Sequence, residues 1–161
     1  MAQRQIREVG DDLLRKRSRE VEVVDDKIRE LLNDMYETMK ASNDGIGLAA
    51  PQVGVLKRLV VIDLGEEGDG KIYKLVNPVI TKAKGEQVCS EGCLSVPGVL
   101  GDVIRPKEVT VEALDENGKK IVIKAKELLA ICLCHEIDHL DGILFTDKAT
   151  ELFDIDAEDE E

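Results

Sequence analysis

Apolar residues recur at three- and four-residue steps along residues 25–41, the spacing that places side chains on one face of a helix. The positions on this face are Ile28, Leu31, Leu32, Met35 and Met39. The pattern predicts an N-terminal helix with one buried face, which serves packing only and ends in the polar segment 42–45. Earlier in the chain, two aspartates open residues 11–15 and predict a shorter helix.

From residue 58 onward the apolar residues form short runs that are typical of strands. Residues 59–62 are all apolar and predict a buried strand, which ends at the glycine-rich exposed turn 65–70. Residues 72–80 predict a strand that bends, because Asn77-Pro78 lies within it. Shorter runs at residues 88–89 and 99–104 predict two further strands on either side of a loop.

The last strands and the second long helix complete the pattern. Residues 109–114 and 121–123 flank the sequence Asp-Glu-Asn-Gly, a strong signal for a β-hairpin. A helix is predicted from about residue 127 to residue 140, and a short helix or extended arm over residues 146–153. The order helix, strands, helix predicts an α+β fold of mostly antiparallel β-sheets packed around the second long helix.

Composition narrows the classes of function. A chain of 161 residues predicts one domain over residues 1–161, with a solvated acidic tail at 154–161. The formal net charge of −12 argues against a nucleic acid or an anionic membrane as partner, and four aromatic residues offer little for base stacking. With no signal-like or membrane-spanning apolar stretch, we expect a cytoplasmic protein, whose four cysteines are ligands or core residues rather than disulfides.

The only two histidines, His135 and His139, lie four residues apart in the predicted helix with Glu136 between them. Residues four apart project from the same helix face. A His-Glu-x-x-His helix binds a divalent metal through both rings and presents a carboxylate beside it. The alternative is a histidine pair that binds no metal. For a metal site, at least one more ligand must come from elsewhere in the chain.

Two other segments combine small residues with groups that carry chemistry. Residues 45–52, GIGLAAPQ, place a run of small residues before Gln52, whose amide could face a substrate oxygen. Residues 91–98, EGCLSVPG, place Cys93 in what we expect to be a loop, from which its thiolate could reach the metal. The alternatives are a packed turn under the core for the first segment and a buried structural cysteine for the second.

Taken together, the segments GIGLAAPQ, EGCLSVPG and HEIDHLDG (135–142) resemble the peptide deformylases of the bacterial type, in order and in spacing. The resemblance implies a hydrolase that removes the N-formyl group from the N-terminal formylmethionine of newly synthesised proteins and releases formate. It implies N-formylmethionyl nascent peptides as partners, with transient contact with the ribosome. It also implies one divalent metal ion, Fe²⁺ in the native enzyme, with Zn²⁺, Ni²⁺ or Co²⁺ as substitutes.

Roles follow from the resemblance residue by residue. Cys93, His135 and His139 would bind the metal, and Glu136 would be the general base that later protonates the leaving amine. The side-chain amide of Gln52 and the backbone N–H of Leu94 would stabilise the oxyanion. The residues expected to bind substrate are Ile46, Gly47, Leu128, Ile131 and Cys132.

The substrate pocket also has support from helix geometry. At about 100° per residue, Leu128, Ile131 and Cys132 fall on the same side of the helix as the two histidines. An apolar stripe one to two turns from the metal suits an unbranched methionine side chain, although ordinary core packing is the alternative. The backbone of Ile46 and Gly47 would pair with the substrate in a strand-like manner.

Three features differ from the family pattern or lie outside it. Cys134 stands where the family usually has glutamine, and its direction from the helix predicts that it packs or supports the metal ligands from behind rather than binding the metal. The short acidic C-terminus differs from the basic helix that some members use on the ribosome, which argues against that mode of docking. Arg105 is expected to pair with Glu91 and so hold the segment that carries Cys93.

Two functions of other classes compete with this interpretation. A structural zinc module would use Cys89 and Cys93 together with the two histidines, but it leaves Glu136 without a role. A zinc endopeptidase would need a third ligand after the helix, for which Asp147 or Glu151 are the candidates.

Overall fold

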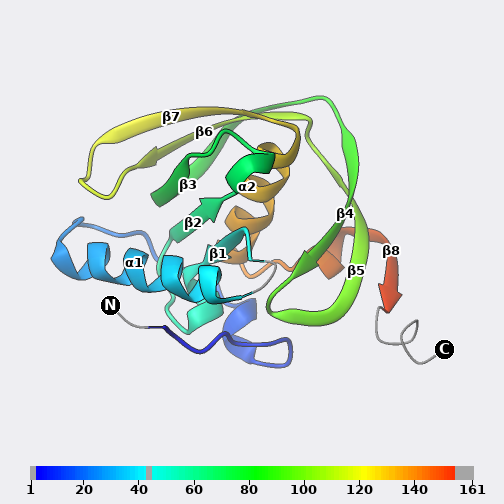
Figure 1. Ribbon diagram of the computed structural model, residues 1–161, viewed down its shortest axis with the longest axis horizontal. Helices are drawn as coiled ribbons and strands as arrows, with labels where there is room; N and C mark the ends of the chain where they lie inside the picture. Colours follow the sequence, from blue (N-terminus) through cyan, green and yellow to red (C-terminus); the bar gives the residue numbers. More distant parts are fainter. Residues whose placement is uncertain (1–2, 43–44, 155–161) are drawn as a thin grey trace.

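Two antiparallel β-sheets lie on either side of helix α2 (Glu127–Leu140) in the computed structural model, which describes residues 3–42 and 45–154 (Figure 1). The larger sheet has the strand order β1-β2-β3-β6-β7, and the smaller has the order β4-β5-β8. Neighbouring strands in both sheets run antiparallel. The predicted α+β class with antiparallel sheets is therefore confirmed.

The elements have the following bounds. The larger sheet consists of β1 (Gly47–Ala49), β2 (Leu59–Asp63), β3 (Ile72–Lys84), β6 (Glu108–Leu114) and β7 (Lys120–Lys126). The smaller consists of β4 (Gln87–Cys93), β5 (Val96–Arg105) and β8 (Ala149–Asp154). The other helices are α1 (Asp26–Ala41), α3 (Phe145–Lys148) and the 3₁₀ turns Asp12–Arg15, Ala50–Val53 and Gly65–Glu67. Within the described residues, every helix is too short or too polar to cross a bilayer.

Strand β2 is buried on both faces, which explains its continuous apolar sequence. Val60 and Ile62 pack into the core that α2 shares with the larger sheet, whereas Leu59 and Val61 pack into the core beneath α1. Helices α1 and α2 thus cover opposite faces of β1 and β2 (Figure 1). All five apolar positions predicted for the buried face of α1 are buried.

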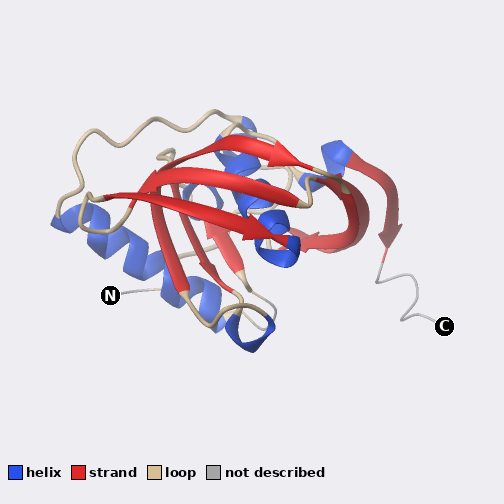
Figure 2. Ribbon diagram, turned by 90° about the horizontal axis from the view of Figure 1, so that it is seen from above, coloured by secondary structure: helices blue, strands red, loops and turns tan. Residues whose placement is uncertain are grey.

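Two segments differ from their predicted form, whereas the C-terminal segment agrees with the predicted short helix or extended arm. Strand β3 bends where Asn77 adopts a positive φ of 52°, as expected, but it continues to Lys84 instead of ending at residue 80. Residues 91–98 do not form a loop, because Cys93 pairs with Val96 and closes a hairpin between β4 and β5. The glycines and proline that indicated a loop lie within or beside this ladder. After α3 the chain forms strand β8, which pairs with β5 at one end of the molecule (Figure 2).

The C-terminal end of α2 is fixed by contacts from two distant segments, residues 15–18 and Arg58. The backbone N–H of Ser18 donates to the carbonyl oxygen of Leu140 at 2.7 Å, and Arg58 Nη1 donates to the same oxygen at 3.1 Å. Gly142 follows with a φ of +75°, and a Cβ there would overlap the carbonyl oxygen of Arg15. The turn of α2 that carries His139 therefore has a fixed position. The acidic residues 155–161 lie outside the described part of the chain.

Candidate active site

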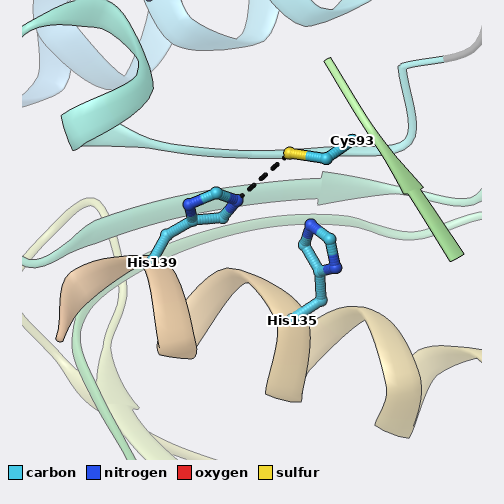
Figure 3. Close-up of side chains that lie close together, drawn as sticks. All are labelled: Cys93, His135 and His139. Atoms are coloured by element: carbon cyan, nitrogen blue, oxygen red, sulfur yellow. Dashed lines mark hydrogen bonds between the residues drawn. The ribbon is translucent and has the colours of Figure 1, made fainter. Parts of the chain in front are cut away.

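His135 and His139 project from the same side of α2, as Figure 3 shows. Their ring centroids lie 5.1 Å apart, and both side chains are buried. Leu133, which precedes His135, and Ile137, which lies between the histidines in the sequence, pack in the core that α2 shares with the larger sheet. The spacing of these residues thus places the core-packing side chains on one side of α2 and the two imidazole rings on another.

Cys93 brings a sulfur to these rings from the other sheet. It is the last residue of β4, directly before the Leu94-Ser95 turn, and its Sγ lies 3.3 Å from Nε2 of His139 (Figure 3). One ligand atom from each of Cys93, His135 and His139 lies within 4.8 Å of the other two. Metal bonds of roughly 2.0–2.3 Å require ligand atoms about this close. The fold therefore gathers the three predicted ligands, although Cys93 precedes His135 by 42 positions in the chain.

The surroundings of the three residues suit a cation. Burial alone would lower the pKa of His135, but the charge of Glu136 and the contacts with Cys93 and Glu91 raise it well above its usual value. Burial and the neighbouring His135 lower the pKa of His139 well below its usual value, which keeps this ring neutral as a metal ligand must be. One sulfur and two imidazole nitrogens form a donor set for Zn²⁺ or Fe²⁺. The residues present therefore fit a divalent metal.

A buried ionic network fixes the orientation of His135. Its Nδ1 lies 2.8 Å from Oε1 of Glu91, so its Nε2 is the nitrogen left for the site. Arg105 donates to both carboxylate oxygens of Glu91 at 2.9 Å and to Asp138 at 2.7 Å. Burial would raise the pKa of Glu91, yet the hydrogen bonds from Arg105 and His135 hold it below its usual value. The expected Arg105–Glu91 pair is present, and it joins β4, β5 and α2.

Glu136 lies buried beside the candidate metal ligands. Its Oε2 is 4.0 Å from Nε2 of His135, and its Oε1 has no hydrogen-bond partner among the described residues. Burial raises the pKa of Glu136 to about 7, against the opposing effect of His135. A Cβ at Gly47 would lie 2.7 Å from Oε2, so β1 can approach this carboxylate only because residue 47 is glycine. A carboxyl group with a pKa near neutrality is suited to proton transfer.

Gln52 lies in the 3₁₀ turn after β1 and reaches the turn of the β4–β5 hairpin. Its Oε1 accepts from the backbone N–H of Ala49 at 2.9 Å, and its Nε2 donates to Oγ of Ser95 at 3.1 Å. The same Nε2 lies 3.5 Å from Sγ of Cys93. The amide donor of Gln52 is therefore beside the candidate metal ligands, and Leu94 is the residue between Cys93 and Ser95.

A cavity of about 480 Å³ opens beside the site. Its walls contain all five predicted substrate-binding residues: Ile46, Gly47, Leu128, Ile131 and Cys132. Gln52, Cys93, Leu94, His135 and Glu136 also line it, whereas His139 does not. The structure thus places the predicted residues around one cavity, with His139 behind its wall. Cys134 instead packs in the core shared by α2 and the larger sheet.

Several residues at this site were missed from the sequence. Val99 and Leu100 of β5 form part of the cavity wall, Asp138 joins Arg105, and Ser95 contacts Gln52. Asp138 offered a weak signal, since it lies three residues after His135 on the same helix. The others depend on the continuation of the β4–β5 hairpin through residues 91–98, where the sequence indicated a loop.

The two competing ligand sets are not assembled. Among the residues that the structure describes, Cys93, His135 and His139 form the one group placed to bind a metal, and Cys89 is outside it. Asp147 instead pairs with Arg15 and accepts from the backbone N–H of Leu144, and Glu151 lies exposed on β8. Neither a four-ligand structural zinc site nor a third ligand after α2 is therefore present in the described part of the chain.

Comparisons with known proteins agree with this geometry. Residues 3–153 match the polypeptide deformylase family. A peptide deformylase of Acetivibrio thermocellus is 61% identical over 156 residues, which cover 97% of this chain and 89% of that protein. Peptide deformylase 2 of Clostridium acetobutylicum is also 61% identical, over 94% of this chain and 98% of that protein.

Solved structures show the same fold. The crystal structure of a peptide deformylase from Ehrlichia chaffeensis in complex with actinonin has a TM-score of 0.89 and 44% identity, covering 94% of this chain and 91% of that one. A peptide deformylase from Legionella pneumophila has a TM-score of 0.86 and 46% identity, covering 92% of this chain and 86% of that one. The chain belongs to the polypeptide deformylase family, hydrolases that remove the N-formyl group from the N-terminal formylmethionine of proteins.

Proposed function

We propose that Cys93, His135 and His139 hold the divalent metal ion of this deformylase and that Glu136 is its proton-transfer residue. The single observation that carries the proposal is the convergence of one sulfur and two imidazole nitrogens, from β4 and α2, within 4.8 Å. The buried Glu91 carboxylate beside His135 adds support, because an acceptor at Nδ1 is what a metal-binding histidine requires.

A divalent ion held by these three residues would supply Lewis acidity for the formyl carbonyl and for water. Glu136 accepts a proton from water as the oxygen attacks the formyl carbon, and it then donates that proton to the amine nitrogen as the C–N bond breaks. The products are formate and a free amino terminus. The pKa of about 7 supports this role, because such a carboxyl can exist in either protonation state at neutral pH.

Gln52 and Leu94 are the donors for the oxyanion that develops on the formyl oxygen. Support comes from Nε2 of Gln52, which lies 3.5 Å from Sγ of Cys93 and so beside the reaction centre. The Leu94 backbone follows the ligand cysteine directly in the hairpin turn. Donors that are already in place for developing charge are a large source of rate enhancement.

The cavity beside the site takes the methionine side chain. Leu128, Ile131 and Cys132 supply an apolar wall from α2, which favours an unbranched apolar side chain over a charged one. Gly47 begins the edge strand β1 and Ile46 directly precedes it, and the two pair with the substrate backbone as an added strand.

The remaining assignments concern the native metal, the cellular location and the partners of the enzyme. We assign Fe²⁺ as the native ion, with Zn²⁺, Ni²⁺ or Co²⁺ as substitutes, and the cytoplasm as the place of action on nascent chains. Residues 1–161 act as one catalytic domain. We also assign transient contact with the ribosome.

The test is anaerobic purification with metal analysis, followed by a formate-release assay on formyl-Met-Ala-Ser. We expect one metal ion per chain and formate release from the formylated peptide, with no cleavage of casein. Cys93→Ser should lose metal and activity together, whereas the matched change Cys89→Ser should keep the metal, because Cys89 lies outside the ligand group. Metal loss in Cys89→Ser, or full metal content in Cys93→Ser, would contradict the assignment.

A further inference from the structure

The carboxamide of Gln52 is held at both of its ends. The Oε1 end accepts from the Ala49 backbone N–H, and the Nε2 end donates to Oγ of Ser95. Gln52 and Ser95 are both buried, and Ser95 is 0% exposed. A buried amide donor without an acceptor is costly, so this pair of contacts selects one of the two possible orientations of the carboxamide.

The orientation determines what Gln52 can offer to a substrate. An amide nitrogen carries two hydrogens. One of them is donated to Oγ of Ser95, and the other is donated to Sγ of Cys93 at 3.5 Å, so it points to the place where a substrate formyl oxygen can accept it instead. The opposite orientation would present Oε1 there, and an oxygen would repel a developing oxyanion. The Ala49 N–H, which can only donate, thus selects the orientation, and the Ser95 hydroxyl holds the Nε2 end in place at the reaction centre.

The backbone of both residues is held by one further segment. The N–H of Arg7 donates to the carbonyl oxygen of Gln52 at 2.6 Å, and the N–H of Val9 donates to the carbonyl oxygen of Ser95 at 2.7 Å. The segment before the first 3₁₀ turn therefore ties the turn after β1 to the turn of the β4–β5 hairpin. Because these contacts are to the backbone, they leave the Ser95 hydroxyl to hold the Nε2 end of the Gln52 carboxamide.

We propose that Ser95 is a positioning residue for deformylation, whose hydroxyl holds the Gln52 amide with its N–H directed at the substrate formyl oxygen. The proposal rests on the oxyanion role given to Gln52 above. It assigns Ser95 no contact with substrate or metal. Ser95 therefore affects kcat only through Gln52. The loss of kcat caused by substituting Ser95 should then depend on whether Gln52 is present.

The experiment is a double-mutant cycle of Ser95→Ala and Gln52→Ala, with kcat, KM, metal content and Tm measured for each protein. Loss of an oxyanion donor typically lowers kcat about 10²–10³-fold. We expect Ser95→Ala alone to lower kcat on the order of 10-fold, which is less than the loss of a whole oxyanion donor. KM and metal content should be nearly unchanged. In the Gln52→Ala background the same change should alter kcat less than about 2-fold.

Ser18→Ala is the matched control, because Ser18 is also a buried serine but its Oγ has no hydrogen-bond partner among the described residues. It should leave kcat unchanged. If Ser95→Ala does not accumulate as folded protein, Ser95→Cys goes through the same cycle, since a thiol is a weak acceptor of similar shape. Equal losses from the Ser95 change in both backgrounds, or no loss in either, would overturn the positioning role. An unchanged kcat in Gln52→Ala would overturn the oxyanion role as well, whereas metal binding and formate release would still stand.

Discussion

Removal of Arg105 should destabilise the protein and weaken metal binding at the same time. Arg105 is 2% exposed and donates three charged hydrogen bonds, two to Glu91 and one to Asp138. In Arg105→Ala, Asp138 keeps Lys148 at 3.0 Å, but Glu91, 5% exposed, retains only Nδ1 of His135. Breaking a buried pair by removing one partner costs about 3–5 kcal/mol. We expect a value near the lower end, about 3 kcal/mol, because only one carboxylate loses its cation.

The assay is urea unfolding of the metal-free protein, together with titration of the metal-free protein with Zn²⁺. Loss of a partner behind a metal ligand typically weakens metal binding about 10- to 100-fold, and we expect a change of that order. The control is Lys126→Ala, which removes the exposed Lys126–Glu108 pair and should cost less than about 1 kcal/mol. A loss below about 1 kcal/mol in Arg105→Ala with unaltered Zn²⁺ affinity would refute the reasoning.

The dependence on pH gives an independent check. Because the folded-state pKa of Glu91 is lowered from 4.5, its contribution to stability is present above about pH 4.5 and is lost as the pH falls through the folded-state pKa. Without Arg105, burial is largely unopposed and should raise the pKa of Glu91, so the variant can protonate this carboxyl at mildly acid pH. The difference in unfolding free energy between parent and variant should therefore be largest near neutral pH. It should shrink as the pH falls through the raised pKa of Glu91 in the variant, above 4.5, and on through the lowered pKa in the parent. A difference independent of pH would mean that Glu91 is not the residue affected.

Three other substitutions or treatments test separate parts of the structure. The iron-loaded enzyme should lose activity in air much faster than the nickel-loaded enzyme, because a ferrous centre with a thiolate ligand is easily oxidised; equal decay rates would count against this. Ile131→Phe narrows the cavity and should raise KM for formyl-Met peptides at least several-fold. An unchanged KM would mean that Ile131 does not contact the methionine side chain of the substrate. Gly142→Ala should lower the unfolding free energy by more than about 1 kcal/mol, because the positive φ and the Arg15 carbonyl both oppose a Cβ; an unchanged Tm would contradict it.

The sequence predicted the parts of the fold that depend on neighbours along the chain. The apolar positions of α1 and the turn sequence between β6 and β7 specify their elements locally, and the same holds for the spacing of His135 and His139 on α2. That Cys93 shares a metal site with the histidines was inferred from the resemblance of three motifs to one family. Residue patterns alone could not, since β4 and α2 meet only when the smaller sheet has formed.

The missed features have a common cause. Glycine and proline near Cys93 indicated a loop, but Glu91 pairs with Gly101 and Cys93 with Val96, so a ladder forms across them. The contacts of Ser95 with Gln52 and of Arg105 with Asp138 join different elements. Such contacts depend on tertiary packing, and no local pattern in one sequence carries that information.

The network of Glu91, Arg105 and Asp138 links the β4–β5 hairpin to α2 through protein groups alone. The donor atoms are consequently gathered before an ion arrives, and little ordering entropy remains for binding to overcome. We expect a metal bound at the proposed ligands to be removable with a chelator and replaceable by another while the polypeptide keeps its shape, unlike the ion of a zinc finger, whose departure unfolds the chain.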